Sequence, residues 1–324
     1  MGRASFSMNR KSILVIKHGY SDSSGYTRKS GIHYSDVFRS TCLLEDFKGY
    51  EVTWITSEAA CDLFLDNHLI DRLIVVEKPS HLVPKSLGEF HTVINLENSD
   101  VWSRFAAEAS AQHRYGFVGA SPSPGAIDSR HTFQDSLYRH LGRQWSGQRY
   151  SLGYQPRSDV VYDIGFNNFA FPDIPAVNWP GNNWQRLYNQ LKDDFRVSWP
   201  TATDDLQNYM EWIASCQLVL SPDTLGLHLA MALKKKVVAL VGVEATQQPY
   251  LYGCGAKLQP ASSFGCPACE LGNGNLGHSC MEEIRVAMVR NTIEAELNEL
   301  ENSHQLESLL FMHESAYSDS PNPA

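Results

Sequence analysis

Four residues in the stretch LVLSPDTLGLHLAMAL have types and spacing suited to binding a phosphate, namely Asp223, Thr224, Gly226 and His228. The letters LVLS predict a buried strand, PDTLG its C-terminal turn, and LHLAMAL a helix that begins where the strand ends. In open α/β sheets ligands bind at the carboxyl ends of strands, and the free N–H groups at a helix start favour phosphate. The stretch therefore predicts a diphosphate site. The alternative is ordinary capping of a helix by the Asp-Thr pair.

Four of the seven cysteines lie in the last quarter of the chain with the spacing C-x11-C-x2-C-x10-C. They are Cys254, Cys266, Cys269 and Cys280. Four thiolates at this spacing in a glycine-rich loop suit a tetrahedral structural site for iron or zinc. The alternative is a group of reduced thiols without a metal, as is usual in cytosolic proteins.

The elements that must position these residues are short apolar runs that alternate with helical patterns. The first half has strand patterns at 12–17, 50–56, 71–77 and 90–96, and helical patterns at 35–47 and 59–67. The second half has strand patterns at 160–166, 218–221 and 236–242, and helical patterns at 181–195, 206–216 and 227–233. Strands that alternate with helices predict parallel sheets covered on both faces. The predicted fold class is α/β, with two doubly wound domains in tandem.

The polar, aromatic stretch at 146–159 is typical of a linker between these domains. We expect an N-terminal domain at 1–158 and a C-terminal domain at 159–300, which contains the cysteine-rich loop at 254–280. Residues 301–324 are expected to hold the end of a helix and a tail, HESAYSDSPNPA, whose composition predicts disorder.

Composition narrows the class of protein and of partner. A chain of 324 residues with 43% hydrophobic and 19% charged residues can form two domains with separate cores. No apolar run reaches the roughly 18 to 20 residues of a membrane span, and the N-terminus MGRASFSMNRKS lacks the apolar core of a signal peptide. The net charge is −9, without a basic stripe in either half. We expect a cytoplasmic protein that binds no nucleic acid and does not insert into membranes.

The stretch IASCQLVLSPDTLGLHLAMALKKKVVALVG resembles glycosyltransferase family 9, the ADP-heptose:lipopolysaccharide heptosyltransferases, whose signature is Asp-Thr-Gly, two residues and His-Leu-Ala. Further blocks agree with the family in the same order: SILVIK, YEVTWIT, FHTVINLENSDVWSRFAAEASAQHRYGF, WPGNNWQRLYNQL and CPACELGNGNLGHSCMEEI. The resemblance covers roughly residues 12 to 290.

The resemblance implies a GT-B fold, in which two Rossmann-like domains face each other across a cleft. It implies a C-terminal domain that binds the sugar nucleotide, with ADP-heptose favoured, and an N-terminal domain that binds the acceptor. The implied reaction inverts the anomeric centre and needs no catalytic metal. The acceptor can be a saccharide, a protein or a small metabolite, and a homo-oligomer is compatible with the family. Relatives that glycosylate autotransporter proteins have a four-cysteine iron site that the cysteine cluster resembles.

The family's catalytic base is an Asp that follows a glycine at the start of the helix after the first strand. The matching text here is HYSDVFRST, which carries that role to Asp36. Ser35 replaces the glycine, and the connection before it is longer than in the family. Asp22 in this connection is therefore a competing carboxylate. An alternative is that Asp36 only caps its helix.

The family's donor loop matches Asp223, Thr224, Leu225, Gly226 and His228. Leu225 stands where the family has a glycine, so that an unchanged loop path predicts strain at Leu225 or a shift of the glycine's role to Gly226.

Two other positions complete the implied donor site. Asn167 and Asn168 lie where relatives place small polar residues against the phosphates. Val177 replaces a lysine that contacts a phosphate oxygen in relatives, and Lys17, Arg28 or Lys29 could supply the missing cation. These departures motivate a second hypothesis, a catalytically weakened protein that binds sugar nucleotides or acts as a scaffold. A third is a GT-B sugar-nucleotide epimerase.

Overall fold

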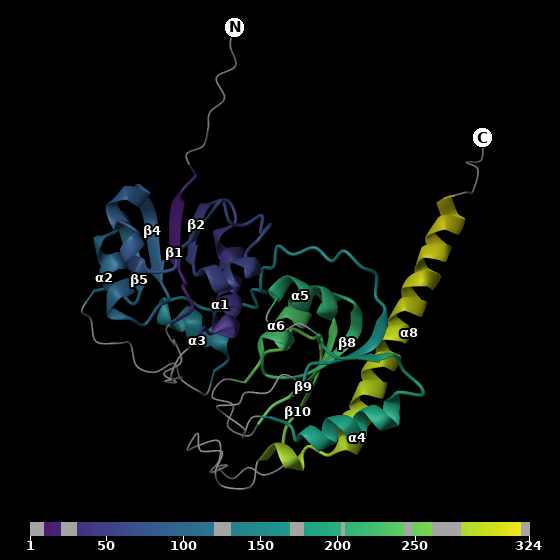
Figure 1. The fold of residues 1–324 in the computed structure, drawn as a ribbon. Helices are drawn as coiled ribbons and strands as arrows, with labels where there is room; N and C mark the ends of the chain where they lie inside the picture. Colours follow the sequence, from purple (N-terminus) through teal and green to yellow (C-terminus); the bar gives the residue numbers. More distant parts are fainter. Residues whose placement is uncertain are drawn as a thin grey trace, which may run out of the picture. The chain divides into compact units, whose positions relative to one another are not determined.

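The computed structural model describes residues 10–20, 31–119, 131–168, 178–201, 205–242, 248–260 and 280–318, without the side chains of 304 and 307–318. The chain divides into two compact units (Figure 1). The first unit comprises Met1–Arg157, Ala202–Met210 and Ala245–Tyr252, and the second comprises Ser158–Thr201, Glu211–Glu244 and Gly253–Ala324.

The first unit is built on a parallel sheet with the strand order β3-β2-β1-β4-β5. Its strands are β1 (Ser12–Ile16), β2 (Glu51–Thr56), β3 (Arg72–Val75), β4 (Phe90–Asn95) and β5 (Ala111–Gly116). The apolar run SILVI forms the central strand because a parallel strand is covered on both faces, and the side chains of 13–16 are fully buried. The strand predictions for the first half are confirmed.

Short helices connect these strands: α1 (Tyr34–Arg39), α2 (Asp100–Glu108), α3 (Phe133–His140) and the 3₁₀-helices η1 (Ser40–Phe47), η2 (Glu58–Leu63), η3 (Pro79–His81) and η4 (Pro84–Leu87). The α2 helix packs Trp102 and Phe105 into a core cluster with Val93 of β4. It begins where the Ser99 side chain accepts a hydrogen bond from the Trp102 N–H, as an N-cap serine does.

The second unit has its own parallel sheet, with the order β10-β9-β8-β6-β7. Its strands are β6 (Tyr162–Phe166), β7 (Val197–Ser198), β8 (Cys216–Pro222), β9 (Lys236–Leu240) and β10 (Gly255–Leu258). Its helices are α4 (Gly181–Leu191), α6 (Leu225–Ala232), η7 (Cys280–Glu283) and α8 (Val286–Ser318), while α5 (Leu206–Ala214) contributes residues to both units. Two parallel α/β units, as the fold class predicted, are therefore present.

The core of the second unit lies between its sheet and the helices α4 and α8, which lie side by side in Figure 1. Trp184 and Leu187 of α4 pack with Val289 and Ile293 of α8 in this cluster. Trp179 also donates its indole N–H to the Ile284 carbonyl over 2.8 Å, which ties the start of α4 to the start of α8.

The two sheets place their topological switch points between different strands. In the first unit the chain order reverses between β1 and β4, and in the second between β6 and β8. Ligands of open α/β sheets bind outside the carboxyl ends of strands at such a point. Residues that follow β1 and β4, or β6 and β8, are therefore the first to inspect for a site.

Two helical predictions are wrong in type. The predicted helix over 35–47 is α-helical only to Arg39 and continues as the 3₁₀-helix η1. Ser40 and Thr41 each donate a side-chain hydrogen bond to the carbonyl three residues back, at Val37 and Phe38. Such bonds compete with the α-helical ladder and favour the tighter helix.

The predicted helix over 59–67 is also a short 3₁₀-helix, η2, which ends at Leu63. The chain turns after it, because Asp66 has a left-handed φ of 56° and Asn67 accepts a hydrogen bond from the Leu69 N–H through its side chain. Asp and Asn are the residues that most readily form such local turns.

The tail at 313–324, which was predicted to be disordered, is helical in its first half. Helix α8 continues through 313–318, the first half of HESAYSDSPNPA, and 319–324 lie outside the described residues. None of the helices in the described part of the chain combines the length and the apolar character that a membrane span requires.

Candidate functional site

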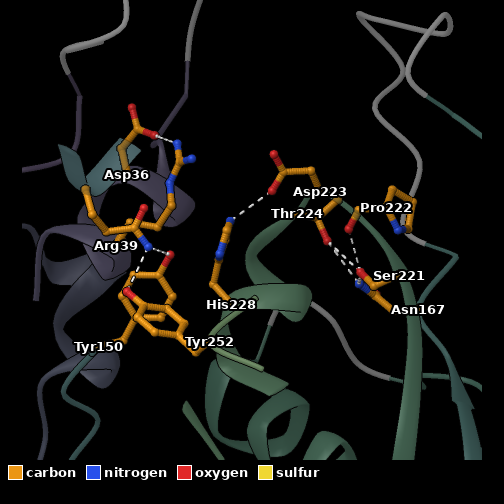
Figure 2. Close-up of polar contacts among 11 residues, drawn as sticks. Asp36, Arg39, Tyr150, Asn167, Ser221, Pro222, Asp223, Thr224, His228 and Tyr252 are labelled. Atoms are coloured by element: carbon orange, nitrogen blue, oxygen red, sulfur yellow. Dashed lines mark hydrogen bonds and ion pairs between the residues drawn. The ribbon is translucent and has the colours of Figure 1, made fainter. Parts of the chain in front are cut away.

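The switch point of the second sheet carries a cluster of neutral polar side chains (Figure 2). Asn167 directly follows β6, is fully buried, and donates its backbone N–H to the Leu220 carbonyl of β8. Its side-chain Nδ2 donates to Ser221 Oγ over 2.8 Å and to Thr224 Oγ1 over 3.0 Å. One amide therefore joins the end of β6 to the turn after β8.

The turn from β8 into α6 is compact. Ser221 Oγ donates to the Pro222 carbonyl over 2.7 Å, and the Thr224 N–H donates to the same carbonyl over 2.8 Å. Thr224 is the N-cap residue of α6 in extended backbone geometry, but its side chain makes no capping hydrogen bond.

Leu225 is already the first residue of α6, and Gly226 is the second. Neither has a positive φ; among the described residues, Asp66, Lys234 and Tyr252 are the non-glycine positions that do. The leucine that replaces the family's glycine is thus accommodated by starting the helix, without left-handed strain at either position.

Asp223 and His228 form a second contact at the same helix. Asp223 Oδ1 lies 3.0 Å from His228 Nε2, and the imidazole is 1% exposed while the carboxylate is 23% exposed. The contact joins Asp223, in the turn before α6, to His228, in the first turn of the helix, and orients both side chains. Asn168 is exposed and, within the described residues, does not take part in the cluster around Asn167.

The carboxyl end of the first sheet has an ionic character. Lys17, which follows β1, and Glu97, which lies just beyond β4, are both 1% exposed, with 3.4 Å between Lys17 Nζ and Glu97 Oε1. The same Glu97 oxygen accepts the Gly19 N–H over 2.7 Å. Gly19 in turn accepts the His33 N–H over 2.8 Å, which closes the base of the connection between β1 and α1.

Asp36 lies in the first turn of α1 and is 6% exposed, and His33 holds the N-cap position. Asp36 Oδ1 lies 2.5 Å from Arg39 Nη2, and the Arg39 guanidinium also lies 4.1 Å from the centre of the Phe133 ring (Figure 2 shows the ion pair). Burial raises the pKa of the Asp36 carboxyl, but the charges of Arg39 and Lys17 outweigh it, and the pKa lies below its ordinary value. Asp36 is therefore a carboxylate at neutral pH.

Some sequence-predicted residues lie outside this description. Asp22, Arg28, Lys29, Val177, Cys266 and Cys269 fall outside the described residues. Cys280 is buried in the core cluster of the second unit, and Cys254 is partly buried before β10. The part of the chain that the structure describes contains no group of three or more metal-ligating side chains. The four-cysteine site stays a prediction.

Three site residues were not singled out from the sequence. Ser221 is the last residue but one of the apolar strand β8, and Glu97 lies two residues beyond the apolar strand β4, which is the signal that could have identified them. Arg39 lies three residues after Asp36 on one helix face, the spacing of an ion pair. The candidate cation Lys17 is paired with Glu97.

No family model matches this chain, and no curated protein matches it. Solved structures do match. The glycosyl transferase family 9 protein of Veillonella parvula DSM 2008 has a TM-score of 0.64 at 18% identity, over 89% of this chain and 98% of its own. The ADP-heptose lps heptosyltransferase II of E. coli has a TM-score of 0.59 at 16% identity, over 90% and 99%.

The chain has the fold of glycosyltransferase family 9. A third match is the iron-containing dodecameric glycosyltransferase TibC of enterotoxigenic E. coli, with a TM-score of 0.56 at 13% identity over 90% of this chain and 77% of its own. The family 9 fold confirms, at the level of structure, the resemblance that the sequence blocks indicated.

Proposed function

We propose that this chain is an inverting glycosyltransferase that moves a heptose or related sugar from a nucleotide-sugar donor, with ADP-heptose favoured, to an acceptor hydroxyl. The observation that carries the proposal is the start of α6 at the switch point of the second sheet. There the side chain of the N-cap residue Thr224 makes no capping hydrogen bond to α6. The first-turn N–H groups and the positive end of the helix dipole are suited to a diphosphate.

The fold likeness supports this donor class. One of the matching structures is described as an ADP-heptose heptosyltransferase, and TibC has been solved in complex with ADP-D-β-D-heptose. For the present chain we assign donor binding to the C-terminal domain at 159–300, with Thr224, Leu225, Gly226 and the Asp223–His228 pair at the diphosphate.

We assign acceptor binding to the N-terminal domain at 1–158, in the GT-B arrangement. Asp36 would take the proton from the acceptor hydroxyl while its oxygen forms the new bond to the anomeric carbon. The bond from that carbon to the diphosphate breaks on the opposite side, and its electron pair leaves with the diphosphate. The N–H groups at the start of α6 stabilise the charge that develops there, so that this route needs no catalytic metal.

The acceptor class is narrowed by charge. Residues 1–160 carry 18 basic and 17 acidic side chains and are close to neutral, whereas the rest of the chain carries 9 basic and 19 acidic side chains, a net charge of −10. Binding to an anionic lipid surface normally needs a basic face. We therefore favour an acceptor that is not presented on such a surface, such as a protein, a saccharide precursor or a small metabolite. A structural iron or zinc at the four cysteines remains part of the proposal, and TibC is described as containing iron.

A second candidate is a protein that binds sugar nucleotides but transfers sugar slowly. The contact that favours it is the ion pair between Asp36 and Arg39, which occupies one oxygen of a carboxylate that is only 6% exposed. An acceptor would have to reach the other oxygen.

The first test is the thermal stability of the purified protein with ADP, UDP, GDP and their sugar conjugates. A ligand at about 100 times its dissociation constant should add roughly 2.7 kcal/mol to the free energy of unfolding. We expect stabilisation by ADP or ADP-heptose that is lost in Asp223→Ala. Stabilisation by another nucleotide would replace the donor, and no shift with any nucleotide would contradict the proposed function.

A further inference from the structure

The Asn167 side chain is directed at two hydroxyl oxygens of the turn that leads into α6 (Figure 2). Ser221 Oγ donates its proton to the Pro222 carbonyl, so that it must accept from Asn167. This requires the amide nitrogen, with its two N–H groups, to face the hydroxyls. Its two donors then match two acceptors, Ser221 Oγ and Thr224 Oγ1.

This arrangement changes what Thr224 can do. A threonine at an N-cap normally accepts a hydrogen bond from the second or third N–H of its helix. Here the Thr224 oxygen accepts from Asn167 instead, and the Leu227 N–H is bonded to the Thr224 backbone carbonyl over 3.1 Å. The Thr224 side chain makes no capping bond. Thr224 Oγ1 also lies 3.4 Å from Ser221 Oγ, and because the Ser221 proton is directed at the Pro222 carbonyl, the Thr224 proton serves this contact.

We propose that Asn167 is a positioning residue that prevents Thr224 from capping α6, which keeps the Leu225 and Gly226 N–H groups at the start of the helix available to a diphosphate. The inference rests on the proposed function and deepens it. Asn167 is fully buried, so that it acts through Thr224 and does not itself touch the ligand. Ser221 is the second acceptor that fixes the orientation of the amide.

The test is a double-mutant cycle with Asn167→Ala, Thr224→Val and the double variant. The probe is the nucleoside diphosphate that stabilises the wild type, and dissociation constants are measured by calorimetry. Asn167→Ala should weaken binding by about tenfold, because a freed Thr224 occupies an N–H group that a charged ligand would use. Valine cannot cap, so in the Thr224→Val background the same change should cost less than about threefold. An equal loss in both backgrounds would mean that Asn167 contacts the ligand directly, and would overturn the proposal.

A ligand-free measurement separates this inference from the proposed function. Hydrogen exchange of the Gly226 and Leu227 amides is followed in the same four proteins. In Asn167→Ala the freed Thr224 should cap the helix and slow exchange at one of these amides at least about threefold, and the double variant should lack this protection. Unchanged or faster exchange in Asn167→Ala would overturn the inference, even if nucleotides bind as proposed.

The matched control is Asn189→Ala on the exposed face of α4, where the asparagine accepts a hydrogen bond from Gln185. It should alter neither the affinity nor the exchange at α6. If the wild type binds no nucleotide, the proposed function fails, and the exchange experiment alone decides the role of Asn167.

Discussion

The carboxyl ends of the two sheets differ in how their buried polar side chains are held: by ion pairs in the first unit and by hydrogen bonds between neutral groups in the second. At the switch point of the first sheet, and in the helix that follows β1, the chain holds two internal ion pairs, Lys17 with Glu97 and Asp36 with the partly buried Arg39. The neutral amide of Asn95 at the end of β4 hydrogen-bonds to the Glu97 backbone beside them.

At the switch point of the second sheet the fully connected buried cluster is an amide and two hydroxyls, Asn167, Ser221 and Thr224. The ionisable pair there, Asp223 and His228, lies at the start of α6 beside this cluster.

The difference follows from what each site is proposed to do. A carboxylate that is to accept a proton must be kept ionised although it is buried, and neighbouring cations do this for Asp36. A site for a diphosphate gains most from neutral donors and a helix start, because these need no internal counter-charge while the ligand is absent. Under the proposed function, the same sheet architecture positions a base in the first unit and an anion site in the second, depending on the residues that follow its strands.

The largest effect on stability is expected when the Glu97 side chain is removed, which tests the difference between the two switch points. Glu97→Ala takes the Glu97 carboxylate away from the buried Lys17 ammonium, and it also removes the acceptor of the Gly19 N–H. We expect the free energy of unfolding, measured in urea, to fall by about 3–5 kcal/mol. Asn167→Ala in the second unit removes neutral bonds and should cost only about 1–3 kcal/mol.

The control for Glu97→Ala is the charge-free pair Lys17→Met with Glu97→Leu. Replacing both ions by apolar groups should restore much of the lost stability, because the cost lies in the unpaired charge. If Glu97→Ala and Asn167→Ala cost the same, the two switch points do not differ as described.

A smaller effect is expected from Arg39→Met. Burial is the largest single influence on the pKa of the Asp36 carboxyl, and without the guanidinium it is opposed mainly by Lys17, so that the pKa should rise, as measured by carbon NMR of the side chain. We expect a loss of about 1.5–3 kcal/mol at neutral pH, the range for a hydrogen bond to a charged group. An unchanged pKa would show that Arg39 does not hold the charge.

The pH dependence has a definite sign. The pKa of Asp36 is lowered in the folded protein, so that its contribution to stability is present above the unfolded value near 3.8 and is lost as the pH falls through the folded value. The stability difference between wild type and Arg39→Met should therefore be largest at neutral pH and shrink in acid. A difference that is constant from neutral pH to acid would contradict the assignment of the ion pair.

The smallest effect on the free energy of unfolding is expected at the pair of Asp223 and His228 in the second unit. Asp223→Asn replaces the carboxylate that lies 3.0 Å from His228 Nε2 by a neutral amide of the same shape. We expect a loss of about 0.5–1.5 kcal/mol in urea unfolding, because the amide can keep one contact. Asp193→Asn, which changes a carboxylate that is 81% exposed, is the control and should lie within about 0.5 kcal/mol of the wild type.

Most of the fold could be predicted from the sequence because the central strands are continuous apolar runs. Such runs are visible in the sequences of β1, β2 and β8, which are SILVI, EVTWIT and CQLVLSP. Strand β5, AQHRYG, has no apolar run, since four of its residues are exposed at the edge of the sheet. The 3₁₀-helices η1 and η2 were predicted only as helical patterns, because the spacing of apolar residues does not show the local hydrogen bonds of side chains such as Ser40.

The site could be predicted only where it is local. Asp223, Thr224 and His228 follow one another within a single turn and helix. The partners of Asn167 lie 54 and 57 residues away, and Glu97 lies 80 residues beyond Lys17, so that only the strand order brings them together. The segment Ala245–Tyr252 belongs to the first unit through side-chain contacts, such as the hydrogen bond that Gln134 Nε2 donates to Tyr252 Oη over 2.8 Å and 118 residues of sequence.

The measurement that tests the central claim most directly is sugar transfer by Asp36→Asn. Donor binding is followed by thermal shift, and transfer by release of nucleoside diphosphate with the acceptor that the wild type uses, chosen from saccharides, proteins and small metabolites. Asparagine has the same shape and can still accept from Arg39, but it cannot take a proton. We predict that donor binding stays unchanged while transfer falls by at least about a hundredfold. Transfer at the wild-type rate would contradict the assignment of the base to the first unit, and joint loss of donor binding would contradict the division of roles between the two units.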